Sequence, residues 1–157
     1  MTKGPAKRQR ASTRPGSVYC ILLADGSYGY CVVVKKPFVV FPNCRSDVPL
    51  AAESVLRHQP LFRIFIMSSS YRSERWKLIG SIELPAEWKK YPKFYRRDAI
   101  HQEQYSIYDP ETELETPAQI EDCKGLEVWA VWSAVHVEPR LLDQLSGGSP
   151  AKYGVMV

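Results

Sequence analysis

Residues 16–34, GSVYCILLADGSYGYCVVV, are almost entirely apolar or aromatic on both sides of an Asp25-Gly26 pair. That pair is preferred in two-residue type I′ turns, because both central residues need a positive φ angle, and it predicts a β-hairpin. With such a turn, Cys20 lies opposite Cys31 and the two thiols share one face. A hairpin with a solvated face would alternate apolar and polar residues, which this one does not. We therefore expect both faces to be buried, and an exposed tyrosine patch is the alternative.

The rest of the pattern predicts more strands than helices. Apolar runs predict strands at 38–42, 61–67, 75–84, 105–108 and 127–135. Helices are predicted at 50–58 after Pro49, at 117–124 behind a Thr116–Gln119 capping box, and around Leu141–Leu145. The pattern as a whole predicts an α+β fold in a single domain. Its expected core is a mostly antiparallel, strongly bent sheet with a few short helices, and a partly barrel-like closure is the alternative.

The length of 157 residues suits one domain with a single core. We expect a disordered basic leader at 1–15, a folded domain at 16–146 and a frayed tail at 147–157. Residues 1–14 carry five cations and no acid, whereas the remainder carries 16 basic and 17 acidic groups. The leader is either a solvated extension or an arm for nucleic acid or a membrane surface. With no apolar run of about 20 residues and no secretory signal pattern, we expect a cytoplasmic protein without a membrane partner.

Charge is divided unevenly within the folded part. Residues 57–97 contain ten cations and three acids, whereas residues 98–127 contain nine acids and a single cation, Lys124. Either the two segments neutralise each other locally, or the acidic segment faces an oppositely charged partner. The stretch 109–115, DPETELE, has the composition of an exposed loop. The residues predicted to lie at or near the rim of a partner interface are Asp109, Glu111, Glu113 and Glu115.

Residues suited to catalysis or metal binding are sparse. The cysteines at 20, 31, 44 and 123 form no C-x-x-C pair, and buried free thiols are preferred over a Cys20–Cys31 disulfide. His58, His101 and His136 are far apart in the chain and belong to no metal-binding motif. His101 stands near Asp98 and Glu103, but a solvated loop histidine is the simpler interpretation. The four tryptophans either line a ligand slot or fill the core, and core placement is preferred. We predict no catalytic residues, no metal site and no cofactor.

Three stretches point to a family when taken in order: residues 16–34, WKLIG (76–80) followed by KFYRRD (93–98), and GLEVWAVWSAVHVEPRL (125–141). Together they resemble the Immunity protein 26 family of bacterial polymorphic toxin systems, over roughly residues 16–142. The resemblance implies a cytosolic protein that binds and neutralises a cognate toxin domain, with no nucleic acid bound by the folded body.

The same family label is also attached to a small phosphotriesterase, which makes hydrolysis of organophosphate esters the alternative function. Such hydrolysis most simply uses a metal-bound hydroxide, and the sequence offers no cluster of ligands for a metal. A stoichiometric inhibitor needs only a complementary surface. The immunity function is therefore preferred, and an enzyme is not expected.

Overall fold

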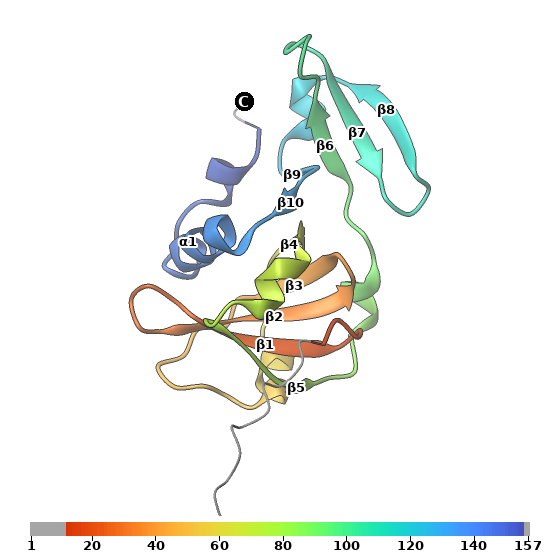
Figure 1. Ribbon diagram of the computed structural model, residues 1–157. Coiled ribbons are helices and arrows are strands. Elements are labelled where there is room, and N and C mark those ends of the chain that lie inside the picture. Colours follow the sequence, from red (N-terminus) through yellow and green to blue (C-terminus); the bar gives the residue numbers. More distant parts are fainter. Residues whose placement is uncertain (1–11, 156–157) are drawn as a thin grey trace, which may run out of the picture.

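Two β-sheets make up most of the structure, a computed structural model that describes residues 12–155 (Figure 1). The larger sheet has the strand order β10-β4-β3-β2-β1-β5, and the smaller has the order β8-β7-β6-β9. The larger sheet consists of β1 (Ser17–Leu22), β2 (Tyr28–Lys35), β3 (Phe38–Pro42), β4 (Pro60–Ile66), β5 (Trp76–Ser81) and β10 (Val131–Trp132). The smaller consists of β6 (Phe94–Arg97), β7 (Tyr105–Asp109), β8 (Leu114–Ala118) and β9 (Glu127–Val128). The described residues also form one α-helix, α1 (Ala134–Leu145), and the 3-10 helices η1 (Ala52–Arg57), η2 (Ser68–Arg72), η3 (Ala86–Lys89), η4 (Ile120–Cys123) and η5 (Pro150–Tyr153).

This architecture confirms a mostly stranded α+β fold with few helices. The expectation of one strongly bent sheet is wrong, because the chain leaves the larger sheet after β5 and builds a second sheet with its own edges. Pro85 and Pro92 flank η3 in the connection, and proline removes the N–H that a continuing ladder needs. Within residues 12–155 the strands do not close into a barrel. No helix in this range is both long enough and apolar enough to cross a bilayer.

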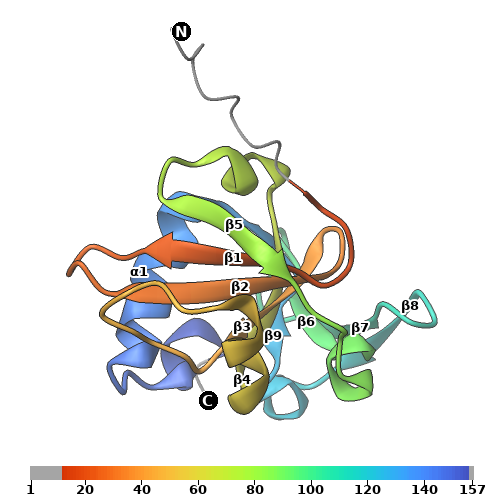
Figure 2. The same cartoon turned by 90° about the horizontal axis from the view of Figure 1, so that it is seen from below.

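Both faces of the first hairpin are buried, as its sequence predicts. On one face Tyr19 and Ile21 pack with Val137 and Leu141 of α1. Gly29 lets α1 come close, since a Cβ at this position would lie 2.7 Å from the Leu141 side chain. The opposite face packs against η1 and against residues from the connection and the smaller sheet. Figure 2 shows the larger sheet with α1 behind it and η1 in front.

The register of this hairpin differs by one residue from the prediction. Tyr19 pairs with Cys31 and Cys20 pairs with Tyr30. The connection is longer than a two-residue turn: Gly26, with φ of +87°, donates its N–H to the Leu23 carbonyl, and the Leu23 N–H donates to the Ser27 carbonyl. A shift of one residue moves a side chain to the other face. Cys20 and Cys31 therefore lie in separate cores, and all four cysteines are free and buried.

The second half of the chain departs most from the predicted elements. Residues 117–124 are not one helix: 117–118 complete β8, and the capping box is formed by Gln119, the N-cap of η4, and Asp122 within η4. Residues 127–135 are not one strand either. Glu127–Val128 pairs in parallel with β6 of the smaller sheet, and Val131–Trp132 pairs in parallel with β4 of the larger sheet. The segment crosses between the two sheets, and its last two residues, Ala134 and Val135, already belong to α1.

The structure describes part of the predicted leader at the N-terminal end and most of the predicted tail at the C-terminal end. Residues 1–11, most of the expected leader, lie outside the described residues, as do residues 156–157. Ser12 is described, and its backbone N–H and carbonyl both bond to the Tyr19 hydroxyl, at 2.8 and 2.9 Å. At the other end, part of the segment expected to be frayed forms η5, whose Tyr153 hydroxyl donates to Asp143 of α1 at 2.7 Å.

Candidate functional site

The four acids predicted for a partner interface lie together on the β7–β8 hairpin. Asp109 ends β7, Glu111 and Glu113 lie in the connecting turn, and Glu115 belongs to β8. The turn is closed by a bond from the Glu113 N–H to the Asp109 carbonyl, at 2.8 Å. Because β8 is an edge strand of the smaller sheet and its first four residues are exposed, the hairpin presents these acids at the surface.

The four carboxylates differ in what they bind within the chain. Glu115 accepts from the Ser106 hydroxyl at 2.6 Å and lies 3.6 Å from Arg96 Nη1. Glu111 accepts from the Tyr91 N–H at 3.3 Å, which places the turn beside the connection between the sheets. Asp109 accepts from the Glu111 N–H at 3.0 Å. Among the described residues, the Glu113 carboxylate has no hydrogen-bond or ion-pair partner.

Local neutralisation accounts for little of the charge on the acidic segment. In the part of the chain that the structure describes, Arg96–Glu115 is the one ion pair between the basic segment 57–97 and the acidic segment 98–127. Arg97, the next cation of β6, donates to the Gln102 carbonyl at 2.6 Å and lies over the Tyr105 ring. Most acids of the segment therefore remain without a cation in contact, and the partner-facing alternative stays a prediction.

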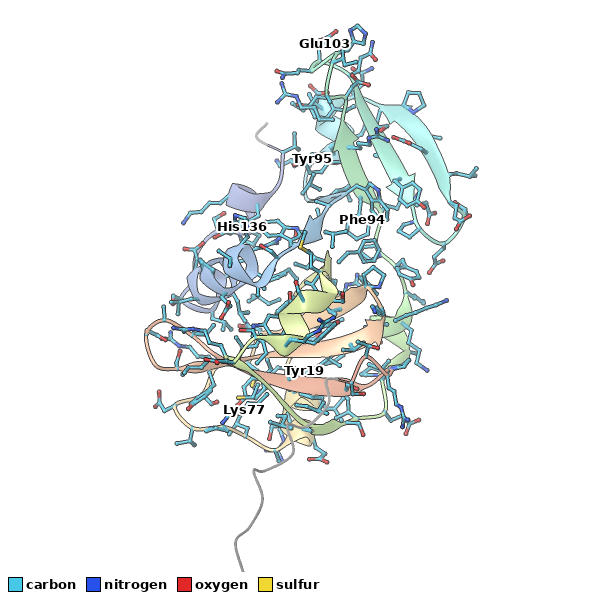
Figure 3. The ribbon with its side chains drawn as sticks, viewed as in Figure 1. Tyr19, Lys77, Phe94, Tyr95, Glu103 and His136 are labelled. Atoms are coloured by element: carbon cyan, nitrogen blue, oxygen red, sulfur yellow. The ribbon has the colours of Figure 1, made fainter. Side chains whose placement is uncertain are left out.

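A shallow hollow of about 540 Å³ extends from the hairpin over the outer part of the smaller sheet. It is lined by Arg96, Asp98, Glu103, Gln104, Tyr105, Ser106, Glu115, Pro117, Ala118 and Gln119. Figure 3 shows Glu103 at the end of the smaller sheet that is farthest from the larger sheet. With three acids and one cation in its wall, the hollow suits a positively charged group better than an anion.

The histidines form no common site. Asp98 Oδ1 accepts the backbone N–H groups of Ile100 and His101, at 2.8 and 2.7 Å, and these bonds lower the pKa of Asp98. Asp98 is therefore engaged in its own loop, next to an exposed His101. His136 Nδ1 lies 2.8 Å from Ser133 Oγ at the start of α1. Residues 12–155 contain no group of three or more His, Cys, Asp or Glu side chains placed to hold a metal ion.

The tryptophans take part in aromatic packing. Trp76 and Trp88 are buried in the two cores of the larger sheet. Trp129 has its ring centroid within 4.3–5.2 Å of the rings of Phe65, Phe94 and Tyr108, and so joins the two sheets. Phe94 points into this junction in Figure 3. This packing agrees with the preferred placement of the tryptophans in the core.

A buried arginine is the feature that sequence reasoning missed. The Arg140 side chain is 2% exposed, donates from Nε to Gln144 Oε1 at 2.8 Å, and donates from Nη2 to Glu127 Oε2 at 2.8 Å. Aromatic rings cover its guanidinium at 4.0–4.9 Å from Cζ. These rings belong to Phe62, Trp132 and Tyr153. Burial raises the pKa of Glu127, while the charge and hydrogen bond of Arg140 act against that rise.

Comparison with known protein families gives a match. The family model described as Immunity protein 26 matches residues 14–106, which is more than half of the chain. The matched range runs from β1 into β7 and ends before Asp109. No curated protein and no solved structure matches the chain.

Proposed function

The chain belongs to the Immunity protein 26 family, and on that basis we propose that it binds and neutralises a cognate toxin domain of a bacterial polymorphic toxin system in the cytosol. Such an inhibitor acts by occupying a surface of its target, so it needs complementary shape and charge but no catalytic group. An uneven surface charge and a sheet that extends from the main core both suit this role (Figure 1).

The acidic β7–β8 hairpin is the surface that we assign to the rim of the toxin interface. The observation that carries this assignment is the single ion pair, Arg96–Glu115, that joins the acidic segment to the basic one within the described residues. The remaining acidic charge attracts cations, and toxin domains that act on nucleic acid need a basic surface for their substrate. The assigned residues are Asp109, Glu111, Glu113 and Glu115.

Association kinetics with the cognate toxin test this assignment. A toxin-like domain encoded immediately upstream identifies that toxin. Replacing Glu111, Glu113 and Glu115 with Lys should slow association by about tenfold or more at low salt, because rim charges act mainly on the association rate. The difference from the unchanged chain should shrink as salt is added.

A matched variant separates the effect of the hairpin's charge on the association rate from the effect of the net charge of the whole chain. Glu53 of η1, Glu74 ahead of β5 and Glu83 after β5 are exposed and lie outside the hairpin. Replacing these three with Lys makes the same change in net charge without touching the hairpin. The hairpin variant should associate at least several-fold more slowly than this control. Equal rates for the two variants would remove the hairpin from the interface.

A further inference from the structure

The outer edge of β8 is an open side of the smaller sheet. β8 is the terminal strand in the order β8-β7-β6-β9, and no strand of the described residues pairs with its other side. Its first four residues, 114–117, are exposed, and Figure 1 shows β8 on the outer side of the smaller sheet. An unpaired edge presents backbone N–H and C=O groups to which another strand can bind.

The pairing pattern fixes which way the backbone groups of β7 point. The Asp98 N–H donates to the Gln104 carbonyl at 2.9 Å, in the register that continues the β6–β7 ladder. Bonded and non-bonded pairs alternate along an antiparallel ladder. The backbone of Ser106 therefore bonds to β6, whereas the backbone of its neighbour Ile107 bonds to β8.

Glu115 and Pro117 are the residues of β8 whose backbone groups point outward. Ile107 pairs with Thr116, so the backbone of Thr116 bonds inward and the residues on either side of it do not. The outer edge therefore offers the N–H and C=O of Glu115 and the C=O of Pro117, because proline has no N–H. One donor and two acceptors suit a short added strand. One of its residues exchanges two bonds with Glu115, and another donates to the Pro117 carbonyl.

Charge on one face of the smaller sheet restricts the side chains of such a strand. Arg96, Ser106 and Pro117 lie opposite one another in turn, and directly opposite residues share a face. Glu115 lies on this face too, two residues from Pro117. All four line the hollow that has three acids and one cation in its wall. Every second side chain of an added strand would lie on this face, where Lys or Arg is favoured.

The other face of β8 suits apolar side chains. Leu114 is 65% exposed and shares this face with Thr116 and Ile107. The side chain between two cations of the added strand would lie here, where a β-branched or other apolar residue packs well. A second copy of this chain fits poorly. Pairing two β8 edges would bring the two Glu115 carboxylates together on one face, and like charges on neighbouring strands are destabilising.

We propose that the outer edge of β8 binds an extended basic segment of the toxin domain as an added strand. Lys or Arg alternates in this segment with apolar or β-branched residues. Its backbone bonds to Glu115 and Pro117, and its cations face the hollow. This binding mode rests on the proposed function and names how the acidic hairpin holds its target. The backbone bonds fix the orientation of the toxin, whereas the rim acids act on the association rate.

Amide hydrogen exchange of the full chain, followed by NMR, tests this binding mode. In the free chain the outward Glu115 N–H should exchange fast, whereas the Thr116 N–H, which bonds to β7, should exchange slowly. Saturation with the toxin domain should slow the exchange of Glu115 by about tenfold or more. Thr116 is the internal reference for an amide that is already bonded.

Two variants at one position separate the backbone from the carboxylate. Glu115→Pro removes the outward N–H without removing a bond to β7, and Glu115→Gln removes the charge but keeps the N–H. Glu115→Pro should bind the toxin domain about tenfold or more weakly than Glu115→Gln, because a partner carbonyl loses its donor. Slow exchange at Thr116 shows that the hairpin is intact in each variant.

A peptide tests the edge without the toxin and without any substitution. The probe is the blocked pentapeptide Lys-Val-Lys-Val-Lys, and its reference, Lys-Lys-Lys-Val-Val, has the same composition and charge but no alternation. The alternating peptide should shift the β8 amide signals in a saturable way and at several-fold lower concentration than the reference peptide.

Two results would overturn this binding mode. One is a stable toxin complex in which the Glu115 exchange is unchanged, or in which an intact Glu115→Pro binds as well as Glu115→Gln. In that case toxin neutralisation stands and the edge is excluded. The other is an equal response of the β8 signals to the two peptides, which would show a general response to charge. A toxin domain that the unchanged chain does not bind would instead contradict the proposed function itself.

Discussion

Arg140 of α1 donates from Nη2 to both carboxylate oxygens of Glu127, and so ties the helix to β9 of the smaller sheet. Removing one member of a buried pair leaves the other charge without compensation, at a typical cost of about 3–5 kcal/mol. Arg140→Met and Glu127→Leu should each lower the free energy of unfolding by about this amount. Urea denaturation measures the change.

The double variant gives the control for this prediction. Replacing both residues removes both buried charges, so Arg140→Met with Glu127→Leu should destabilise by clearly less than the sum of the single variants. Strict additivity would contradict the account of the pair, and so would single variants within about 1 kcal/mol of the unchanged chain.

Acid should release η5 from α1. The Tyr153 hydroxyl and Lys152 Nζ both bond to Asp143, at 2.7 and 3.2 Å, and they lower the pKa of Asp143. A carboxyl with a lowered pKa in the folded state stabilises the fold above its ordinary pKa, and this contribution disappears as the pH falls through the lowered value. The amide signals of residues 150–153 should therefore change in that acidic range.

Two variants, Tyr153→Phe and Asp143→Asn, test whether the Asp143 carboxylate and its bond from Tyr153 cause this response to acid. Tyr153→Phe removes the largest contribution to the lowered pKa, so the transition should move to higher pH. Asp143→Asn should shift the same amide signals already at neutral pH. Signals that titrate alike in Tyr153→Phe and in the unchanged chain would show that this contact does not couple η5 to the pH.

The N-terminal boundary of the fold is testable through Ser12. The Tyr19 side chain is 1% exposed, and its hydroxyl bonds to both backbone groups of Ser12. Deleting residues 1–11 should leave the melting temperature within about 2 °C. Deleting residues 1–14 leaves a buried hydroxyl without these partners, which costs about 1–3 kcal/mol. At about 2–4 °C per kcal/mol for a domain of this size, the loss is several degrees.

Tyr19→Phe controls for this interpretation. In the chain that lacks residues 1–14, Tyr19→Phe removes the unpartnered hydroxyl and should recover part of the lost stability. If both deletions leave the melting temperature unchanged, Ser12 does not stabilise the buried tyrosine. A loss of ten degrees from removing residues 1–11 alone would show that the leader contributes to the fold.

The amino-acid pattern predicts strands β1 to β5 of the larger sheet well because each carries its own apolar signal. Phe62, Ile64 and Ile66 lie in one core, as their alternation predicts. The register of the first hairpin was wrong because Asp25-Gly26 also suits a longer loop with glycine at positive φ. The tertiary packing settles the register: Tyr19 faces Tyr71 and Trp76, with ring centroids 5.0 and 6.3 Å away.

The candidate functional residues also differ in whether the local sequence reveals them. The exposure of the DPETELE stretch follows from its local composition, and the structure places its acids on one hairpin. Arg140 has no such signal, since a cation in an amphipathic helix normally faces solvent. It is buried because Phe62, Trp132 and Tyr153, which are far apart in the sequence, meet around it. The single strand predicted at 127–135 was wrong because apolar residues predict burial but do not indicate which sheet a segment joins. In the structure this segment joins both sheets in turn.

The alternative function has a direct test. If the chain is an inhibitor and not a phosphotriesterase, the purified protein should hydrolyse an activated phosphotriester no faster than buffer, with or without added divalent metal. Turnover that depends on metal and is lost in His58→Ala, His101→Ala or His136→Ala would replace toxin neutralisation with hydrolysis.

Titration of the cognate toxin domain with the purified chain tests the central claim most directly. At toxin concentrations well above the dissociation constant, toxin activity should fall linearly and reach the background at one equivalent of chain. An unrelated protein of similar size and net charge should not inhibit. Full toxin activity in the presence of a large excess of the folded chain would contradict the proposed function.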